Sequence, residues 1–320
     1  MIHARTTLRL QADAAGEAQA ARILREGGLV AFPTETVYGL GADATNPRAV
    51  AGIYEAKGRP RFNPLIAHVA SLEQARREGT FSPLAEKLAQ KFWPGPLTLV
   101  VPLAETASVC DLARAGLPSI GLRMPAANIA RDLIAAAGRP IAAPSANRSG
   151  HVSPATADHV LADLEDRIDA VLDGGACAVG VESTIVALLD DTPRLLRPGG
   201  VAREDIEVFL GMGLAGAEPG DSQPLAPGLL ASHYAPGASV RLNARELEPG
   251  ETGLDFAGQF AGAFDLSPSG DLEEAAANLF SALRTLDASG AMRIAVAPIP
   301  NQGLGEAIND RLARAAAPRP

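Results

Sequence analysis

The sequence lacks the cysteine pattern of a metal-binding or disulfide-stabilised protein. Its 320 residues include two cysteines, Cys110 and Cys177, neither of which has a second cysteine or a histidine at metal-ligand spacing. A zinc finger, a zinc ribbon and a disulfide framework are therefore not expected. Two buried thiols in a reducing compartment fit this usage better. Aromatic residues are also scarce, at 4%, so the core must be built mainly from Ala, Leu, Val and Ile.

Long apolar runs and an excess of basic residues are missing as well. The longest mainly apolar stretches, such as residues 97–104, have about eight residues, whereas a membrane-spanning helix needs about 20. Residues 1–19 contain no apolar segment like that of a signal peptide. The net charge of −9 argues against a broad nucleic-acid surface, but not against a local basic pocket. We therefore expect a soluble, cytoplasmic protein without membrane contact.

The order of helix and strand signals predicts an α/β fold. The length suggests roughly two domains, since about 150 residues make one. Capping signals predict helices over 14–26, from Pro47, from Pro83, from Pro154 to about Arg167, and over 202–211. Short apolar segments predict strands at 29–34, 65–70, 97–103, 119–124, 140–145 and 181–189. Because helices and strands do not alternate strictly, we expect a twisted, mixed sheet with helices.

The composition changes over residues 212–237, where Gly, Pro and Ala dominate without periodicity. This segment is too long for an ordinary connection and predicts a linker. Strand signals at 239–242 and 293–299 and helix signals at 271–287 and 304–316 then predict a small α/β unit. We predict a main domain over 1–207, a linker or lid over 208–237 and a small C-terminal domain over 238–320. The C-terminal domain contains no polar cluster that suggests a catalytic site.

The segment KGRPRFNPL (57–65) is rich in cations. Lys57, Arg59 and Arg61 stand two residues apart, and Pro60 favours an extended backbone at Arg59. Residues two apart in an extended chain face the same side, so three cations would share one space. That arrangement is costly unless an anion lies between them, and a polyphosphate suits the guanidinium group. A solvated basic loop is the alternative.

Two further segments place unusual residues at strand ends. In FPTETVYGLGADA (32–44), Gly39 and Gly41 would allow the backbone to approach a ligand closely. An ordinary strand end with capping threonines explains the segment equally well. In GLRMP (121–125), Arg123 lies in an otherwise apolar strand. If buried, it needs a carboxylate partner, which could be internal or belong to a ligand.

Polar residues also gather in APSANRSGHVSP (143–154), after a strand and ahead of a predicted helix. Hydroxyls, an amide and free N–H groups could cradle an anion or nucleotide there, or form ordinary turns. Ser183 lies in the apolar segment VESTIV (181–186), and Arg197 ends the next one, in LLRPGG (195–200). No Walker phosphate-binding sequence, GxSxG elbow, HExxH motif or kinase signature is present.

Taken together, these segments resemble the Sua5/YrdC/YwlC family of threonylcarbamoyl-AMP synthases. The matches, in family order over about 1–205, are PTETVYGLG, KGRPRFNPL with His68 just beyond, PGPLT, GLRMP, PSANRSG, EST and LRPGG. The phrase APGLLASHYAP (226–236) resembles the segment that marks the two-domain Sua5 type, with Leu229 where Met is expected. The resemblance implies a YrdC-like catalytic domain with a twisted mixed sheet, followed by a small Rossmann-like Sua5 domain.

The resemblance also implies a reaction. A nucleotidyltransferase would condense L-threonine, bicarbonate or CO₂, and ATP to L-threonylcarbamoyladenylate and pyrophosphate. The product would serve the threonylcarbamoyl-adenosine (t6A) modification of tRNA, with a separate tRNA threonylcarbamoyl transferase machinery downstream and at most weak tRNA contact. Mg²⁺ would accompany ATP, without a tightly bound organic cofactor and with no metal ligand from the protein.

The site residues follow from the same motif matches. The catalytic cations would be Lys57, Arg59 and Arg61. L-Threonine would be bound by Thr34, His68, Arg123, Ala143 and Ser183. ATP would be bound by Lys57, Arg61, Asn63, Ser119, Ser145, Asn147, Ser153, Arg197 and Tyr234. Because no nucleophile is implied, catalysis would rest on positioning and electrostatics.

The linker would fold over this site, with Tyr234 against ATP, and exclude water from the hydrolysable adenylate. A simple anchor against the second domain is the alternative for Tyr234. Two rival functions are a nucleic-acid binding module and a carbamoyl-transfer enzyme of the HypF kind. The net charge of −9 counts against the first. The second would carry zinc-finger cysteines and an acylphosphatase domain, which are absent here.

Overall fold

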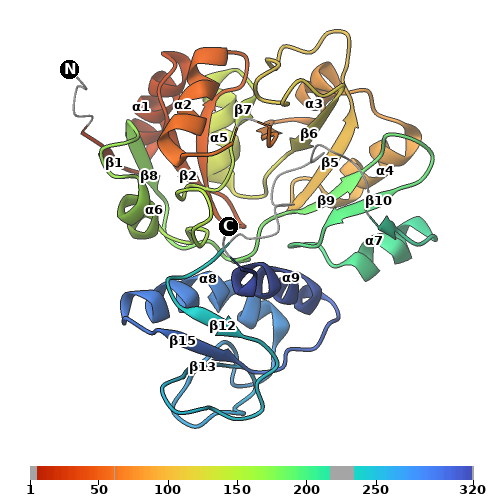
Figure 1. The fold of residues 1–320 in the computed structure, drawn as a ribbon. Helices are drawn as coiled ribbons and strands as arrows, with labels where there is room; N and C mark the ends of the chain where they lie inside the picture. The colour runs from red at the N-terminus through yellow and green to blue at the C-terminus, as the bar shows by residue number, and fades with distance from the viewer. Residues whose placement is uncertain (1–5, 61, 217–233, 319–320) are drawn as a thin grey trace.

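The computed structural model describes residues 6–60, 62–216 and 234–318, which form two α/β units, the first above the second in Figure 1. The strands of the first unit are β1 (Leu8–Gln11), β2 (Val30–Pro33), β3 (Tyr38–Asp43), β4 (Ile66–His68), β5 (Leu97–Pro102), β6 (Ser119–Arg123), β7 (Ile141–Ala142), β8 (Ala170–Asp173), β9 (Thr184–Ala187), β10 (Arg194–Arg197) and β11 (Ala215–Gly216). Its helices are α1 (Ala14–Arg25), α2 (Pro47–Lys57), α3 (Leu72–Glu78), α4 (Pro83–Phe92), α5 (Asn128–Ala137), α6 (Ala157–Leu164) and α7 (Arg203–Leu210).

The first unit is organised around one mixed sheet. Within the described residues its strand order is β1-β8-β2-β3-β7-β4-β6-β5-β9-β10-β11. Strands β4 and β6 pair in parallel, whereas β7 runs antiparallel to both of its neighbours, β3 and β4. This confirms the predicted α/β fold with a mixed sheet. The order brings the ends of β4, β6 and β7, which are far apart in the sequence, to one place.

Helices α2 and α4 begin at Pro47 and Pro83 as the sequence indicates, and α1 lies within the predicted 14–26, whereas α3 and α5 were not predicted. The helix predicted from Pro154 to about Arg167 is present but shorter, because α6 spans Ala157–Leu164 and has Thr156 as its cap. The hydroxyl of Ser153 donates instead to a carboxylate oxygen of Glu182, 2.6 Å away. Ser153 is therefore engaged in a tertiary contact and does not cap a helix.

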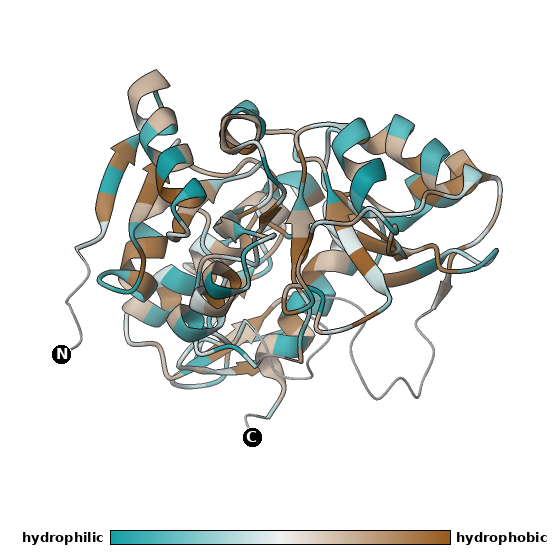
Figure 2. Ribbon diagram, turned by 90° about the horizontal axis from the view of Figure 1, so that it is seen from above, coloured by the Kyte–Doolittle hydropathy of each residue, from teal (hydrophilic) through white to brown (hydrophobic). Residues whose placement is uncertain are grey.

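The core lies on both faces of the large sheet. Along β2, Val30 and Phe32 pack in one apolar cluster and Ala31 packs in another, as expected for side chains that alternate between faces. Alanines contribute much of both clusters, in line with the scarcity of aromatic residues. Figure 2 shows apolar strands between helices that mix apolar and polar residues. The helices therefore cover a sheet that is buried on both sides.

The second unit is a small parallel α/β domain. Its strands are β12 (Ser239–Arg241), β13 (Thr252–Asp255), β14 (Phe264–Asp265) and β15 (Arg293–Val296), and its helices are α8 (Leu272–Ala288) and α9 (Leu304–Ala316). The order is β12-β15-β13-β14, and each of these pairs is parallel. This agrees with the predicted Rossmann-like unit.

The two units share a continuous apolar interface. Val37, Val152 and Val181 of the first unit belong to the same buried cluster as the core of the second. Helices α8 and α9 lie on the side of the second unit that faces the first (Figure 1). A side chain at Gly180 would place its Cβ 2.3 Å from the backbone oxygen of Ala276 on α8, so only glycine permits this approach. The units are thus packed closely against each other.

Elements of the first unit continue to β11, which pairs with β10. Most of the predicted linker, including Leu229, lies outside the described residues. The domain limits at 207 and 237 therefore stay predictions. Among the described residues, no helix is both long and apolar enough to span a membrane.

Candidate functional site

A cavity lies where several strand ends of the first unit meet. Together with the solvent space at its mouth, it holds about 530 Å³ free of protein atoms. The predicted site residues that line it are Thr34, Arg59, His68, Arg123, Ala143, Ser145, Ser183, Arg197 and Tyr234. Gly39, predicted as a point of close backbone approach, also lines it, and so do five residues without a predicted role, namely Thr36, Val37, Ile66, Pro144 and Glu182. Residues that the resemblance assigned to two substrates therefore share one cavity.

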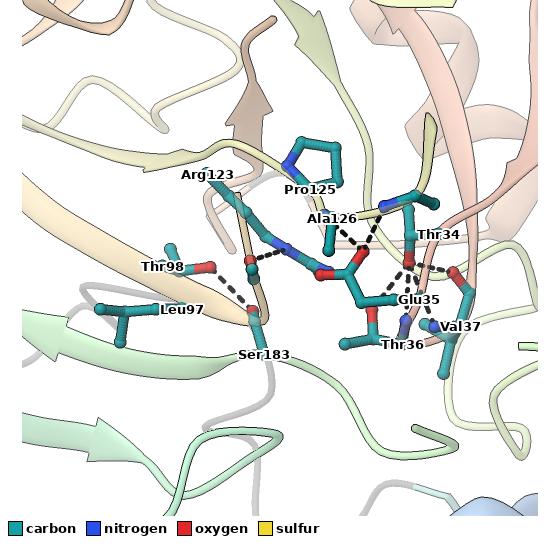
Figure 3. A network of polar contacts seen from close by, with 12 residues as sticks. Thr34, Glu35, Thr36, Val37, Leu97, Thr98, Arg123, Pro125, Ala126 and Ser183 are labelled. Atoms are coloured by element: carbon teal, nitrogen blue, oxygen red, sulfur yellow. Dashed lines mark hydrogen bonds and ion pairs between the residues drawn. The ribbon is translucent and has the colours of Figure 1, made fainter. Parts of the chain in front are cut away.

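Arg123, at the end of β6, is held by an internal carboxylate (Figure 3). Its Nη2 donates to Oε1 of Glu35 at 2.6 Å, and its Nε donates to the backbone oxygen of Gly95 at 3.4 Å. The other carboxylate oxygen of Glu35 accepts the backbone N–H groups of Ala126 and Ala127. Burial alone would raise the pKa of Glu35, but the charge and hydrogen bond of Arg123 lower it. The ion pair thus fixes the guanidinium at the cavity wall.

The hydroxyls near Arg123 already have protein partners. The Oγ1 atom of Thr34 donates to the backbone oxygen of Val37 at 2.7 Å and accepts the N–H of Thr36 at 3.2 Å. The hydroxyl of Ser183 lies 2.7 Å from that of Thr98 (Figure 3). These contacts hold both hydroxyl groups in place at the cavity, as Figure 3 shows.

His68 is a neutral side chain beside this cation. It stands opposite Arg123 in the parallel pairing of β4 and β6. Burial, together with the positive charge of Arg123, lowers the pKa of His68 to about 3. Its Nδ1 is buried and has no hydrogen-bond partner in the part of the chain that the structure describes. A buried polar atom without a partner is costly unless a ligand or water satisfies it.

The basic segment is arranged differently from the expectation. Lys57 is the last residue of α2, and Gly58 ends the helix in the left-handed region, with φ at 61°. The expectation of one extended segment with three cations on one side is therefore wrong for Lys57. Its amine donates to the backbone oxygens of Ser145, at 2.5 Å, and Asn147. The predicted site residue Arg61 lies outside the described residues.

Lys57 and Arg59 are nevertheless both buried and near each other. Burial, and then the charge of Arg59, lower the pKa of Lys57 well below its usual value. Burial is also the main cause that lowers the pKa of Arg59 to about 10, with Arg197 adding to it. Arg59 donates to the backbone oxygen of Pro64, but its buried Nε has no partner among the described residues. Each of these cations makes the charged form of its neighbour less favourable. An anion bound beside them would therefore be stabilised.

Unsatisfied polar atoms gather around this part of the cavity. The described residues contain six buried side-chain nitrogen or oxygen atoms without a hydrogen-bond partner. Four of them belong to predicted site residues, namely Arg59, Asn63, His68 and Asn147. The amide nitrogen of Asn147 donates to Arg148 and His151, so its oxygen is the free acceptor. Native proteins rarely leave such atoms unpaired in a core, so their concentration here marks a ligand site.

Glu182 connects this cavity to the second unit. One of its carboxylate oxygens accepts the hydroxyl of Ser153 at 2.6 Å, and the other accepts Nε of Arg311 at 2.9 Å. Burial would raise the pKa of Glu182, but the charges of Arg311 and Arg197 outweigh it and lower the pKa to about 2. Glu182 is therefore a carboxylate at neutral pH. The sequence signal for it was a glutamate in an otherwise apolar segment, 181–186.

Comparison with known proteins relates this arrangement to one family. The family model described as Telomere recombination, which covers Sua5, YciO and YrdC proteins, matches residues 22–199. A model described as the C-terminal domain of threonylcarbamoyl-AMP synthase matches residues 201–317. The chain belongs to the Sua5/YciO/YrdC family. This confirms the resemblance inferred from the sequence motifs.

Members of the Sua5/YciO/YrdC family match nearly the whole chain. A threonylcarbamoyl-AMP synthase of Bacillus subtilis is 42% identical over 94% of this chain and 93% of its own length. One of Pyrococcus abyssi is 45% identical and covers 92% of each chain. The crystal structure of P. abyssi Sua5 complexed with L-threonine superposes with a TM-score of 0.88 at 40% identity, covering 97% of each chain.

Nine of the 15 residues that the family resemblance predicted line the cavity. Arg61 lies outside the described residues, and those that do not line the cavity are Lys57, Asn63, Asn147, Ser153 and Ser119. Ser119 is buried at the start of β6, opposite Pro102, whereas Arg123 at the other end lines the cavity. The prediction for Gly41 as a point of ligand approach is wrong. A Cβ there would lie 2.7 Å from the ring of Phe32, so the protein's own side chain fills the space. Gly39 does line the cavity.

The sequence reasoning missed two acidic residues, Glu182 in the cavity lining and Glu35 as the partner of Arg123. Glu35 stands inside the quoted segment PTETVYGLG, and Glu182 directly precedes Ser183. Each is buried enough to require a cation, which Arg123 and Arg311 supply. The described residues contain no group of three or more His, Cys, Asp or Glu placed to hold a metal ion.

Proposed function

We propose that this chain is a threonylcarbamoyl-AMP synthase, and that it is a nucleotidyltransferase. It would condense L-threonine, bicarbonate and ATP to threonylcarbamoyl-AMP, pyrophosphate and water. One observation carries the proposal. The lining of one cavity contains buried arginines and two buried nitrogens without partners among the described residues, Nε of Arg59 and Nδ1 of His68, on a chain 40% identical to a Sua5 solved with L-threonine. A cavity with this composition needs an anionic, hydrogen-bonding ligand.

Threonine would bind on the side of Arg123. The Nη1 group of Arg123 has no hydrogen-bond partner among the described residues, so it can donate to the substrate carboxylate while Nη2 stays with Glu35. Charge-assisted hydrogen bonds of this kind are strong. The neutral imidazole of His68 does not repel the substrate ammonium group, and its Nδ1 needs a partner. Thr34, Ala143 and Ser183 complete this side in our proposal.

ATP would bind on the side of Lys57 and Arg59, with Arg61 and Asn63 nearby in the sequence. Ser145, Asn147, Ser153, Arg197 and Tyr234 are proposed as its further contacts. The orphaned oxygens of Asn63 and Asn147 suit N–H or O–H donors of a nucleoside. The cations suit the triphosphate, since phosphate oxygens only accept. Ser119 is kept as the last of these candidates because it lies at the opposite end of β6 from Arg123, which lines the cavity.

Catalysis would rest on charge stabilisation rather than on a protein nucleophile. The carbamate oxygen of carboxylated threonine attacks the α-phosphorus, and the bond to the pyrophosphate oxygen breaks. Negative charge then grows on oxygens that Lys57, Arg59 and Arg61 would contact. Mg²⁺ would enter with ATP and share that charge on the phosphates. We propose the cytoplasm as the location, because the product serves a tRNA modification completed by a separate transferase, with at most weak tRNA contact here.

The decisive experiment measures pyrophosphate release with ATP, Mg²⁺, bicarbonate and each amino acid in turn. We expect release only with L-threonine, and formation of a compound with the mass of threonylcarbamoyl-AMP. Omission of Mg²⁺ should abolish it. Pyrophosphate release that is independent of the amino acid, or none at all, would refute the proposed function.

A variant of Arg123 tests the threonine side separately. Arg123→Lys keeps the charge but loses the planar pair of donors. We expect KM for threonine to rise roughly 10- to 100-fold, which corresponds to one lost charged hydrogen bond, while KM for ATP stays the same. An equal rise in both constants would contradict the assignment of Arg123 to threonine.

A further inference from the structure

The second unit places one side chain against the cavity wall. Arg311 on α9 is fully buried. Its Nε donates to Glu182 at 2.9 Å, and its Nη1 donates to the backbone oxygen of Pro198 at 2.9 Å and to Asp310 at 2.8 Å. Both Glu182 and Pro198 belong to the first unit. The guanidinium thus crosses the interface.

Arg311 supports two residues that line the cavity. Besides Glu182, it lies against the ring of Tyr234, with its Cζ 5.5 Å from the ring centroid. The ring of Phe280 on α8 also stacks on Tyr234, with the centroids 5.5 Å apart and an interplanar angle of 21°. The second unit therefore holds Tyr234 and Glu182 at the cavity through the same guanidinium.

The orientation of Glu182 decides what Ser153 offers to a ligand. The Ser153 hydroxyl donates its hydrogen to Glu182, so its oxygen keeps only acceptor capacity. A phosphate oxygen has no hydrogen to give, whereas a ribose hydroxyl or an exocyclic amine does. Ser153 is completely buried, and its partner Glu182 lines the cavity. In this arrangement Ser153 is suited to the nucleoside rather than to the phosphates.

Resting on the proposed function, we infer that Arg311 is a positioning residue for the nucleotide. It holds the Glu182 carboxylate so that Ser153 presents an acceptor to the nucleoside part of ATP. The small second unit thereby completes the nucleotide side of a site that otherwise lies in the first unit. Without Arg311, the buried carboxylate has Arg197 as its remaining strong cation and is free to turn away from Ser153.

The test compares Arg311→Met with a matched variant, Arg203→Met. Arg203 also pairs across the interface, with Glu306 at 2.5 Å, but neither residue lines the cavity. For Arg311→Met we expect KM for ATP to rise at least about tenfold, the scale of a lost buried hydrogen bond. KM for threonine should change less than twofold. Arg203→Met should change neither constant, and Arg311→Lys should recover part of the loss.

A double variant tests whether the effect runs through Ser153. Ser153→Ala should raise KM for ATP, and adding Arg311→Met to it should raise KM little further, because both act on one contact. Additive effects, or equal effects of Arg311→Met and Arg203→Met, would overturn the inference. So would a rise in KM for threonine that matches that for ATP. An inactive wild-type chain would instead refute the proposed function. Thermal unfolding of each variant distinguishes a variant that misfolds from one that folds but binds ATP less well.

Discussion

Buried polar groups are treated in opposite ways in the two units. In the second unit, Asp255 at the end of β13 is 1% exposed, and its carboxylate accepts the N–H groups of Phe256, Gln259 and Phe260. Ser267 is likewise bonded, to Glu274 and to the N–H of Asp271. In the first unit, several equally buried side chains around one cavity have atoms without any partner among the described residues.

This difference distinguishes structural polar groups from ligand-binding ones. A satisfied buried group lowers the free energy of the folded state, whereas an unsatisfied one raises it until a ligand arrives. Evolved chains tolerate the second kind where function requires it. Arg311 combines both kinds. Its Nε and Nη1 are bonded across the interface, but its Nη2 has no partner in the described part of the chain.

The largest expected effect comes from removing the buried cation Lys57. Lys57→Ala should lower threonine-dependent pyrophosphate formation by at least about 10²- to 10³-fold, as for other lost charge-stabilising donors. The melting temperature should fall only modestly, because the bonds of the amine to the backbone oxygens of Ser145 and Asn147 are lost while the cost of burying its charge beside Arg59 is removed. Steady-state assays and calorimetry check the two parts. Lys87→Ala, at an exposed position on α4, is the control.

A loss of activity that merely follows a loss of folded protein would contradict this prediction, since it would make Lys57 structural. The variant Arg59→Ala is a second test of the proposed phosphate site. It removes a side chain whose Nε is already unpaired, so the fold loses little. Wild-type rates in both variants would reject the proposed phosphate site.

The opposite pattern is expected for the second unit. Asp255→Ala leaves three buried N–H groups without their acceptor and should lower the free energy of unfolding by about 2–4 kcal/mol. The kcat and both KM values of the protein that remains folded should not change, because Asp255 does not line the cavity. Denaturant unfolding and kinetics at low temperature measure the two effects. A change in KM at unchanged stability would contradict the view that the buried polar groups of the second unit are structural.

The pH dependence of the free energy of unfolding tests the cost of burying His68 in the first unit. Burial holds the pKa of His68 at about 3, below its ordinary 6.5. Between these values the unfolded chain binds a proton that the folded chain does not, so His68 lowers stability as the pH falls below 6.5. The slope is at most about 1.4 kcal/mol per pH unit.

The variant His68→Asn should remove this part of the pH dependence. Free energies of unfolding for the two proteins, measured from pH 7 to pH 4, should diverge progressively, with the wild type losing more. Addition of saturating threonine should reduce the difference if His68 contacts it. Parallel curves for the two proteins would show that His68 titrates normally in the folded state.

Local signals in the sequence predicted much of the fold because caps and apolar periodicity act within a few residues. Helix α9 spans Leu304–Ala316, at the predicted 304–316. The pairing of β1 with β8 had no such signal, because partners such as Leu8 and Ala170 meet only through tertiary packing. Strand β3 was also missed, since Gly39 and Gly41 disfavour a strand in isolation. The close packing of Phe32 over Gly41 requires a residue without a side chain there.

The site was predictable to the extent that a motif carries it within one segment. Arg123, His68 and Ser183 each stood in a recognisable segment, and all three line the cavity. The contact between Glu182 and Arg311 joins residues 129 positions apart in different units, so no local pattern could indicate it. The sequence of the second unit contains no polar cluster, as noted above. That pattern could not indicate that one side chain of this unit, Arg311, contacts Glu182 across the interface.

The smallest expected effect belongs to Ser119, where the motif match and the geometry differ. Ser119 lies in the same strand as Arg123 but four residues earlier, which is about 13 Å along an extended strand. It is 5% exposed and outside the cavity lining. Ser119→Ala should therefore change KM for ATP by less than about twofold and the free energy of unfolding by under about 1 kcal/mol. Ser145→Ala, at a residue that does line the cavity, is the matched comparison under the same assay. A larger KM effect at Ser119 than at Ser145 would mean that ATP extends along β6, beyond the cavity that the unpaired atoms outline.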